Sequence, residues 1–190
     1  MTIRGTRTER NLLAAFAGES QARNRYTYFA SIARKEGYEQ ISAIFAETAE
    51  NEREHAKRFF KFLEGGDVEI AAVFPAGRLG TTAENLCAAA DGEAHKWRTL
   101  YPEFARVADE EGFPQVAAYF RAIASVEREH ETRYRVLAER VSAGGIFRRD
   151  EPIRWRCRNC GYIHESPVAP DICPACDHPR AFYEPAADNY

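Results

Sequence analysis

The stretch NEREHAKRF (residues 51–59) returns 75 positions later as VEREHETRY (residues 126–134). Each copy holds a glutamate and a histidine three positions apart, within a segment whose apolar residues recur at helical spacing. The two pairs are Glu52 with His55 and Glu127 with His130. Side chains at this spacing lie on one face of a helix, so each pair can reach a common ion.

Four long helices are expected between residues 8 and 142, because glycine and proline are scarce inside the periodic segments. A capping-box pattern, from Thr81 to Glu84, marks the start of the third helix. The segment 65–80 before it is too long for a tight turn. Two helical hairpins with one long connection predict an all-α, ferritin-like four-helix bundle with one long crossover. The expected helices span residues 8–36, 39–64, 81–111 and 114–142.

Acidic residues interrupt the apolar face of each predicted helix, with Glu19 on the first and Glu93 on the third. A carboxylate pointed into a helical core is costly unless a cation meets it, and two divalent metal ions would balance four carboxylates. One glutamate from each of two helices and a Glu-x-x-His pair from each of the others is the di-iron carboxylate arrangement. Oxygen and nitrogen ligands also accept manganese. The predicted ligands are Glu19, Glu52, His55, Glu93, Glu127 and His130.

The repeat has one break in its register. Tyr26 and Tyr101 keep the spacing of 75, whereas Glu19 and Glu93 are 74 apart. The third helix therefore carries one extra residue between Glu93 and Tyr101. Either a π-bulge absorbs this residue, or the start of the helix is shifted.

Four of the five cysteines form two C-x-x-C pairs near the C-terminus, Cys157 with Cys160 and Cys173 with Cys176. This spacing predicts a tetrahedral four-thiolate metal site, which accepts iron or zinc. His164 and His178 are expected at the surface rather than as ligands. Cys87 lies apart from the cluster and is expected to be a small buried residue.

Composition and charge exclude several classes of protein. The formal net charge is −3, so there is no basic surplus of the kind that binds nucleic acid. The sequence has no apolar run long enough for a membrane span, and its first ten residues lack the apolar core of a secretory signal. We therefore expect a cytoplasmic protein.

The chain resembles rubrerythrins over almost its whole length. The matching stretches are AFAGESQARNRY (15–26), both EREH segments, LYPEFARVADEEG (100–112), CRNCGY and CPAC. The resemblance implies a ferritin-like di-iron domain over residues 1–143, a linker over 144–152 and a rubredoxin-like domain over 153–190. It favours iron over zinc at the four cysteines.

The resemblance also implies a non-haem iron peroxidase, an oxidoreductase that reduces hydrogen peroxide to water. Electrons would come from NAD(P)H through a separate reductase or a carrier such as a rubredoxin, and then through the four-cysteine iron. A homodimer would bring one subunit's thiolate iron near the other's di-iron site. The six predicted ligands match the family's di-iron ligands, with Glu52 and Glu127 bridging or capping the two metals. Tyr26 and Tyr101 match tyrosines beside that site, although both could be plain packing residues.

One position departs from the family pattern, which has a further glutamate ligand where this chain has Lys96. A protonated lysine cannot replace that ligand. Its side chain could point into the site or extend to solvent. The alternative function is a ferroxidase or iron-handling ferritin-like protein, and a metal-stabilised scaffold without activity is a third reading.

Overall fold

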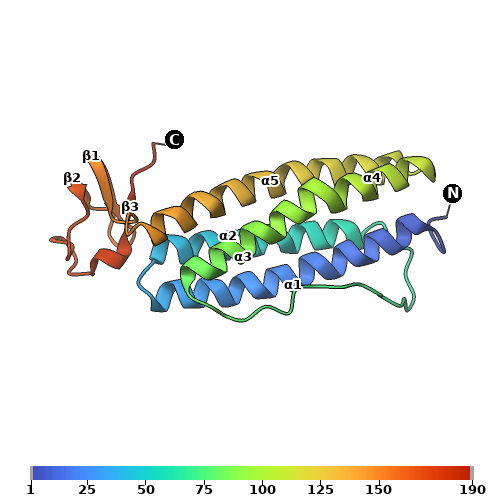
Figure 1. Cartoon of the computed structure of the whole chain (residues 1–190), viewed down its shortest axis with the longest axis horizontal. Coiled ribbons are helices and arrows are strands. Elements are labelled where there is room, and N and C mark those ends of the chain that lie inside the picture. Colours follow the sequence, from blue (N-terminus) through green and yellow to red (C-terminus); the bar gives the residue numbers. More distant parts are fainter. Residues whose placement is uncertain (1, 189–190) are drawn as a thin grey trace.

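Two helical hairpins form the larger part of the molecule (Figure 1). The computed structural model describes residues 2–188. The first hairpin pairs α1 (Arg7–Lys35) with α2 (Glu39–Phe60), and the second pairs a three-part helix with α5 (Pro114–Ser142). The three parts are α3 (Thr82–His95), the π-helix η1 (Lys96–Leu100) and α4 (Tyr101–Glu110). The predicted four-helix bundle with one long crossover is confirmed.

The helix ends show why the sequence folds into hairpins here. Gly37 and Gly112 have φ of 84° and 80°, a conformation that glycine adopts without strain. In each turn the next residue donates its backbone N–H to a carbonyl five residues earlier, at 2.8 Å. The predicted capping box of α3 is present, because Thr81 and Glu84 satisfy each other's backbone N–H groups.

The extra residue of the third helix is absorbed by η1, which begins three residues after Glu93. Of the two explanations left open by the repeat, the π-bulge is therefore the one that the structure shows. A π-turn rotates the following residues relative to a regular helix. Glu93 before η1, Lys96 at its start and Tyr101 directly after it are all buried in the bundle.

The core consists of two aromatic clusters separated by the layer of glutamates and histidines. Tyr26, Phe45 and Tyr134 belong to the cluster nearer the hairpin turn at Gly37. Phe59 and Phe120 belong to the other cluster, where their rings stack with centroids 5.0 Å apart. Apolar packing on both sides therefore covers the polar layer along the axis of the bundle, and its four glutamates are fully buried.

The crossover between the hairpins runs along α1 for most of the length of the bundle (Figure 1). Asn85 fixes its end, since its side chain accepts the N–H of Gly80 and donates to the carbonyl of the same residue. Phe74 lies against Gly18, where an added Cβ would come within 3.3 Å of the ring. The glycine thus allows the crossover to lie close to α1.

A small three-stranded antiparallel sheet follows the bundle, in the order β2-β1-β3. Trp155 and Tyr183 fill its core together with two of the cysteines. The sheet packs at the Gly37 end of the bundle, where Tyr38 and Phe147 stack with ring centroids 6.1 Å apart. Its elements are β1 (Arg148–Cys157), β2 (Ile163–Val168), the 3-10 helix η2 (Arg180–Phe182) and β3 (Tyr183–Pro185). Among the described helices, none has the length and apolar character needed to cross a bilayer.

Candidate metal centres

Six side chains from four helices converge in the middle of the bundle. Their ligand atoms form two groups, and within each group all atoms lie within 4.8 Å of one another. Glu52 and Glu127 belong to both groups, which Glu19 and His55 complete on one side and Glu93 and His130 on the other. All four glutamates are fully buried. The structure thus brings together every residue that the sequence predicted for this centre.

Glu52 and Glu127 each face both histidines. The carboxylate oxygens of Glu52 lie 3.1 Å from His55 Nδ1 and 3.3 Å from His130 Nδ1. Those of Glu127 lie 3.2 Å and 2.8 Å from the same two atoms. A carboxylate with one oxygen in each half of the centre has the geometry of a bridging ligand.

Two buried tyrosines hold the other two glutamates. The Tyr26 hydroxyl donates a hydrogen bond to Oε1 of Glu93, and that of Tyr101 donates to Oε1 of Glu19. Each bond joins α1 to the third helix. Burial, reinforced by the nearby carboxylate, raises the pKa of both phenols well above its usual value, so they remain neutral donors.

Lys96 points into the centre rather than to solvent. Its Nζ lies 2.7 Å from Glu19, 2.9 Å from Glu93, 3.2 Å from Glu52 and 3.4 Å from Glu127. The residue is 7% exposed. Burial alone would lower the pKa of this ammonium, but the four carboxylates raise it well above its usual value, which keeps the group charged.

The four carboxyl groups differ in the direction in which their pKa is shifted. Burial opposes ionisation of all of them, yet Lys96 and the histidines lower the pKa of Glu52 well below its usual value and that of Glu127 to about 2. For Glu19 and Glu93 the effect of burial is larger than that of Lys96. The pKa of Glu19 is therefore raised well above its usual value, and that of Glu93 is raised to about 8. Glu52 and Glu127 are therefore the permanent anions of the metal-free centre.

The donor set fits two metal ions. Each tyrosine occupies Oε1 of its glutamate, while Oε2 of Glu19 and of Glu93 is buried, has no hydrogen bond among the described residues and meets the Lys96 ammonium as an ion pair. Oε1 of Glu52 also lacks a hydrogen bond. A buried carboxylate oxygen without a hydrogen bond is costly, and metal coordination would satisfy it. The chemistry of the six donors is that of a di-iron carboxylate centre.

Metal binding by this centre should release protons. Although burial lowers the pKa of both imidazoles, hydrogen bonds to Glu127 and Glu52 raise it to about 10 for His55 and to about 9 for His130. At pH 7 both histidines and Glu93 are therefore protonated without metal and must lose a proton to become ligands, and the raised pKa of Glu19 adds to the protons that binding removes. We expect the apparent affinity for metal to rise from pH 7 to pH 9.

Calorimetric titration with a divalent metal in buffers of different ionisation enthalpy measures this release directly. The heat should depend on the buffer, with at least about three protons released per centre at pH 7. A heat that is the same in all buffers would contradict the prediction.

The four cysteines of the C-terminal sheet form a second centre. Their sulfurs lie within 4.8 Å of one another, with 3.8 Å between Cys157 and Cys176 and 3.6 Å between Cys160 and Cys173. A tetrahedral ion with metal–sulfur bonds of about 2.3 Å places its sulfurs roughly 3.8 Å apart. The backbone N–H of His178 lowers the pKa of the Cys176 thiol to about 6, which favours the thiolate.

The remaining candidates lie outside both centres. His164 and His178 are partly exposed and belong to neither group of ligands. The interpretation of Cys87 as a buried residue is wrong, because it is exposed on the outer face of α3. Leu86 and Ala89 take the inward positions of that turn.

Sequence reasoning missed one buried carboxylate that positions η1. Glu131, 6% exposed, accepts the indole N–H of Trp97 at 2.7 Å and pairs with Arg98 at 3.3 Å. Trp97 and Arg98 directly follow Lys96 in η1, so Glu131 ties this turn to α5. The signal in the sequence was its place four residues after Glu127, on the same face of the helix.

Comparisons with known proteins agree with this architecture. The family model described as Rubrerythrin matches residues 10–138, and the one described as "Rubrerythrin, rubredoxin-like domain" matches residues 155–184. A rubrerythrin of Porphyromonas gingivalis is 62% identical, with 100% of this chain and 94% of the relative covered. One of Nitratidesulfovibrio vulgaris is 55% identical, with 100% and 99% covered.

Solved structures give the same result. A partially reduced nigerythrin superposes with a TM-score of 0.65 at 30% identity, covering 97% of this chain and 92% of that one. Nigerythrin of Nitratidesulfovibrio vulgaris also appears among the sequence relatives, at 33% identity. The two family models together account for the bundle and for the four-cysteine sheet. This chain belongs to the rubrerythrin family.

Proposed function

We propose that this chain reduces hydrogen peroxide to water at the carboxylate centre, with electrons delivered by way of the four-cysteine centre. The observation that carries the proposal is the pairing, in one chain, of a two-metal carboxylate site with a four-thiolate site. When two iron ions are bound, the first centre supplies the two electrons that cleave the O–O bond. A ferroxidase has no need of the thiolate centre.

The geometry of the centre supports the ligand assignment. Glu52 and Glu127 would hold both metal ions, because each presents one oxygen to each histidine. Glu19 and Glu93 would each bind one metal ion through Oε2, the oxygen that the tyrosine hydroxyl does not occupy. The six ligands are Glu19, Glu52, His55, Glu93, Glu127 and His130, and Cys157, Cys160, Cys173 and Cys176 hold one further iron.

Tyr26 and Tyr101 orient ligands and hold protons beside the reacting atoms. Each hydroxyl fixes Oε1 of one glutamate. Both phenols are fully buried, so their protons are shielded from bulk water. Cleavage of peroxide to water consumes two protons, and the two hydroxyls are the neutral donors closest to the carboxylates.

Electron delivery favours a homodimer. Ala181, which belongs to the cysteine domain, lies next to Gly37, since a Cβ added to this glycine would be 3.7 Å from the Ala181 side chain. The cysteine sheet therefore lies at the start of α2. His55 is 18 residues farther along this hairpin, or roughly 27 Å at 1.5 Å per residue. This separation is too long for efficient direct electron transfer, so a second copy of the chain would have to bring its cysteine centre closer.

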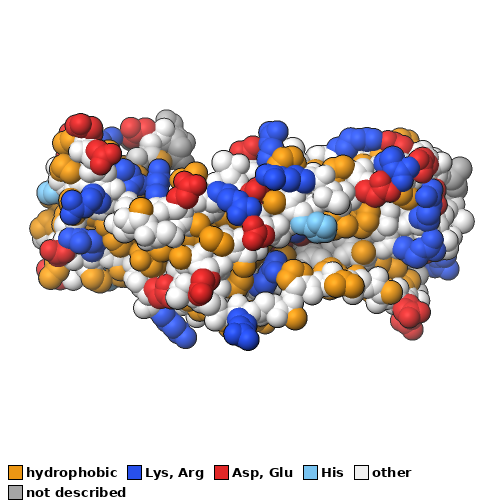
Figure 2. All heavy atoms as spheres, viewed as in Figure 1, with side chains coloured by type: hydrophobic (Ala, Val, Ile, Leu, Met, Phe, Trp, Pro, Cys, Tyr) orange, Lys and Arg blue, Asp and Glu red, His pale blue; other side chains and the backbone are white. Residues whose placement is uncertain are grey.

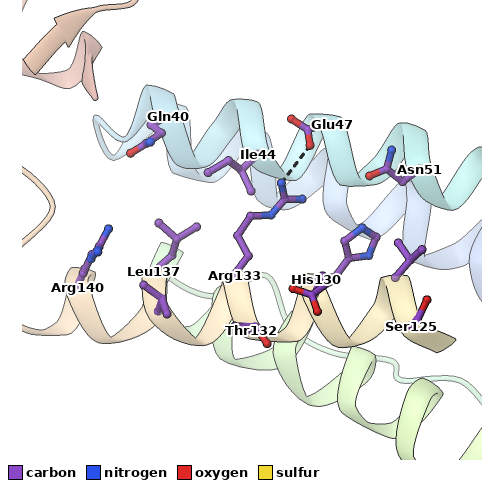
Figure 3. A pocket seen from close by; sticks show the side chains of 13 residues that line it. Gln40, Ile44, Glu47, Asn51, Ser125, His130, Thr132, Arg133, Leu137 and Arg140 are labelled. Carbon is purple, nitrogen blue, oxygen red and sulfur yellow. Dashed lines mark hydrogen bonds and ion pairs between the residues drawn. The ribbon is translucent and has the colours of Figure 1, made fainter. Parts of the chain in front are cut away.

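A groove between α2 and α5 offers a place for that approach. It has a volume of about 670 Å³ and His130 lies in its floor, with Asn51 and Ser125 nearby (Figure 3). Arg133 spans the groove to pair with Glu47 at 3.0 Å. The groove thus leads from the surface to a proposed ligand. The first donor would be a rubredoxin or an NAD(P)H-dependent reductase in the cytoplasm, where free thiols stay reduced.

Anaerobic, fully reduced protein tests the activity. One equivalent of hydrogen peroxide per carboxylate centre should oxidise that centre completely, and a reductase with NAD(P)H should then sustain consumption of further peroxide. Rapid-mixing absorbance follows the first step, and NAD(P)H oxidation follows the second. Continued uptake of ferrous iron into a mineral, without peroxide turnover, would favour the ferroxidase alternative instead.

A further inference from the structure

The side chain of Lys96 occupies the position where a metal ion is expected. All four helical segments that supply ligands, α1, α2, α3 and α5, place a carboxylate within 3.4 Å of its Nζ. The contacts at 2.7 Å and 2.9 Å are made to Oε2 of Glu19 and of Glu93. These are the same oxygens that the tyrosines leave free for a metal.

An ammonium group and a metal ion cannot bind these oxygens at the same time. Both are cations, and both would stand within bonding distance of the same buried carboxylates. Four buried carboxyl groups without any cation are strongly destabilising. A single positive charge that contacts all of them relieves part of this repulsion without metal.

We propose that Lys96 is a built-in substitute for the metal, which holds the carboxylate cluster together in the metal-free protein and is displaced when metal binds. The inference rests on the proposed ligand set, but it is independent of the reaction with peroxide. It implies that the chain binds metal more weakly than the same bundle would with an uncharged residue at position 96.

A cavity beside the centre provides room for the displaced side chain. It has a volume of about 560 Å³ and lies between the crossover, α1 and the third helix, and Lys96 and Tyr101 belong to its wall. Figure 2 shows this face of the molecule, which is hollowed between the crossover and the helices. Asp91 stands on the same wall, where Oδ1 of its carboxylate pairs with Arg135 at 2.8 Å and Oδ2 can accept an ammonium that leaves the centre.

Removal of the positive charge at position 96 should destabilise the metal-free protein and strengthen its binding of metal. Without metal, Lys96→Met should melt roughly 5–10 °C below the wild type, because the carboxylates lose the cation that contacts all four of them. With metal, the dissociation constant should fall at least about tenfold, since binding no longer displaces a positive charge. Lys57→Met is the matched control, because Lys57 is exposed and pairs with Glu54 at 3.0 Å.

Cobalt(II) is a suitable probe, since its thiolate-bound form absorbs separately from the carboxylate-bound form. Melting curves are recorded with chelator, and affinities are measured by competition with a chromophoric chelator. Lys96→Gln is measured in parallel, so that a folding defect of the methionine variant does not decide the result. Tighter cobalt binding together with lower metal-free stability, in either variant but not in the control, supports the inference.

Two other results would overturn it. Equal affinity in the wild type and in both position-96 variants would show that Lys96 does not compete, and would leave the proposed metal centre intact. The absence of cobalt from the carboxylate centre in all of these proteins would refute both the inference and the proposed function.

Discussion

Glu127→Ala is expected to empty the carboxylate centre while the cysteine centre keeps its iron. Glu127 contributes to both groups of ligands and contacts both histidines and Lys96. Its loss should reduce the iron content from about three to about one per chain. The metal-free variant should also lose about 3–5 kcal/mol of folding free energy, because three buried cations lose a partner.

Metal analysis per chain and denaturant unfolding with chelator measure these two effects. Glu54→Ala is the matched control, since Glu54 lies in the same repeated motif but is exposed. The control should retain both metal content and stability. A Glu127→Ala protein that still holds three irons would show that the repeated motif is not a ligand set.

Cys173→Ser is expected to stop donor-driven peroxide reduction without disabling the carboxylate centre. Cys173 is buried in the core of the small sheet, 3.6 Å from Cys160, and its loss leaves three thiolates for a four-ligand site. Turnover supported by NAD(P)H and a reductase should fall to the background of the assay. Chemically reduced protein should still consume one equivalent of peroxide, because the bundle is unchanged.

Cys87→Ser provides the control, since Cys87 is exposed and lies outside the cluster. Steady-state turnover and single turnover are compared for both variants. Full steady-state activity in Cys173→Ser would exclude the four-cysteine centre from the electron path. Loss of the single turnover as well would mean that the substitution acts on the bundle.

The repeat in the sequence was sufficient to predict the four helices and the convergence of the six candidate ligands. Helical periodicity fixes which residues share a face, and an internal repeat requires that both halves bury the same face. The spacing of 74 rather than 75 also located the register break. The sequence did not decide whether the helix start or a π-turn absorbs the extra residue, because both satisfy the same spacing.

The sequence did not determine whether the Lys96 side chain points into the bundle or whether Cys87 is exposed, and the physical cause is the same for both. Each depends on how far the third helix is rotated, and this rotation is set by contacts between distant segments. Glu131 of α5 holds Trp97 and so orients η1, and this pairing joins residues 34 positions apart. Periodicity describes one helix at a time and carries no information on such contacts.

The hydrogen bonds of two buried tyrosines join the two hairpins and couple their local unfolding. Tyr26 of the first hairpin is tied to Glu93 of the second, and Tyr101 of the second is tied to Glu19 of the first. Separation of the hairpins would break both bonds and leave buried carboxylates without partners. Neither hairpin is therefore an independent unit of opening, and the amide hydrogens of all four helices should exchange with solvent as one cooperative block.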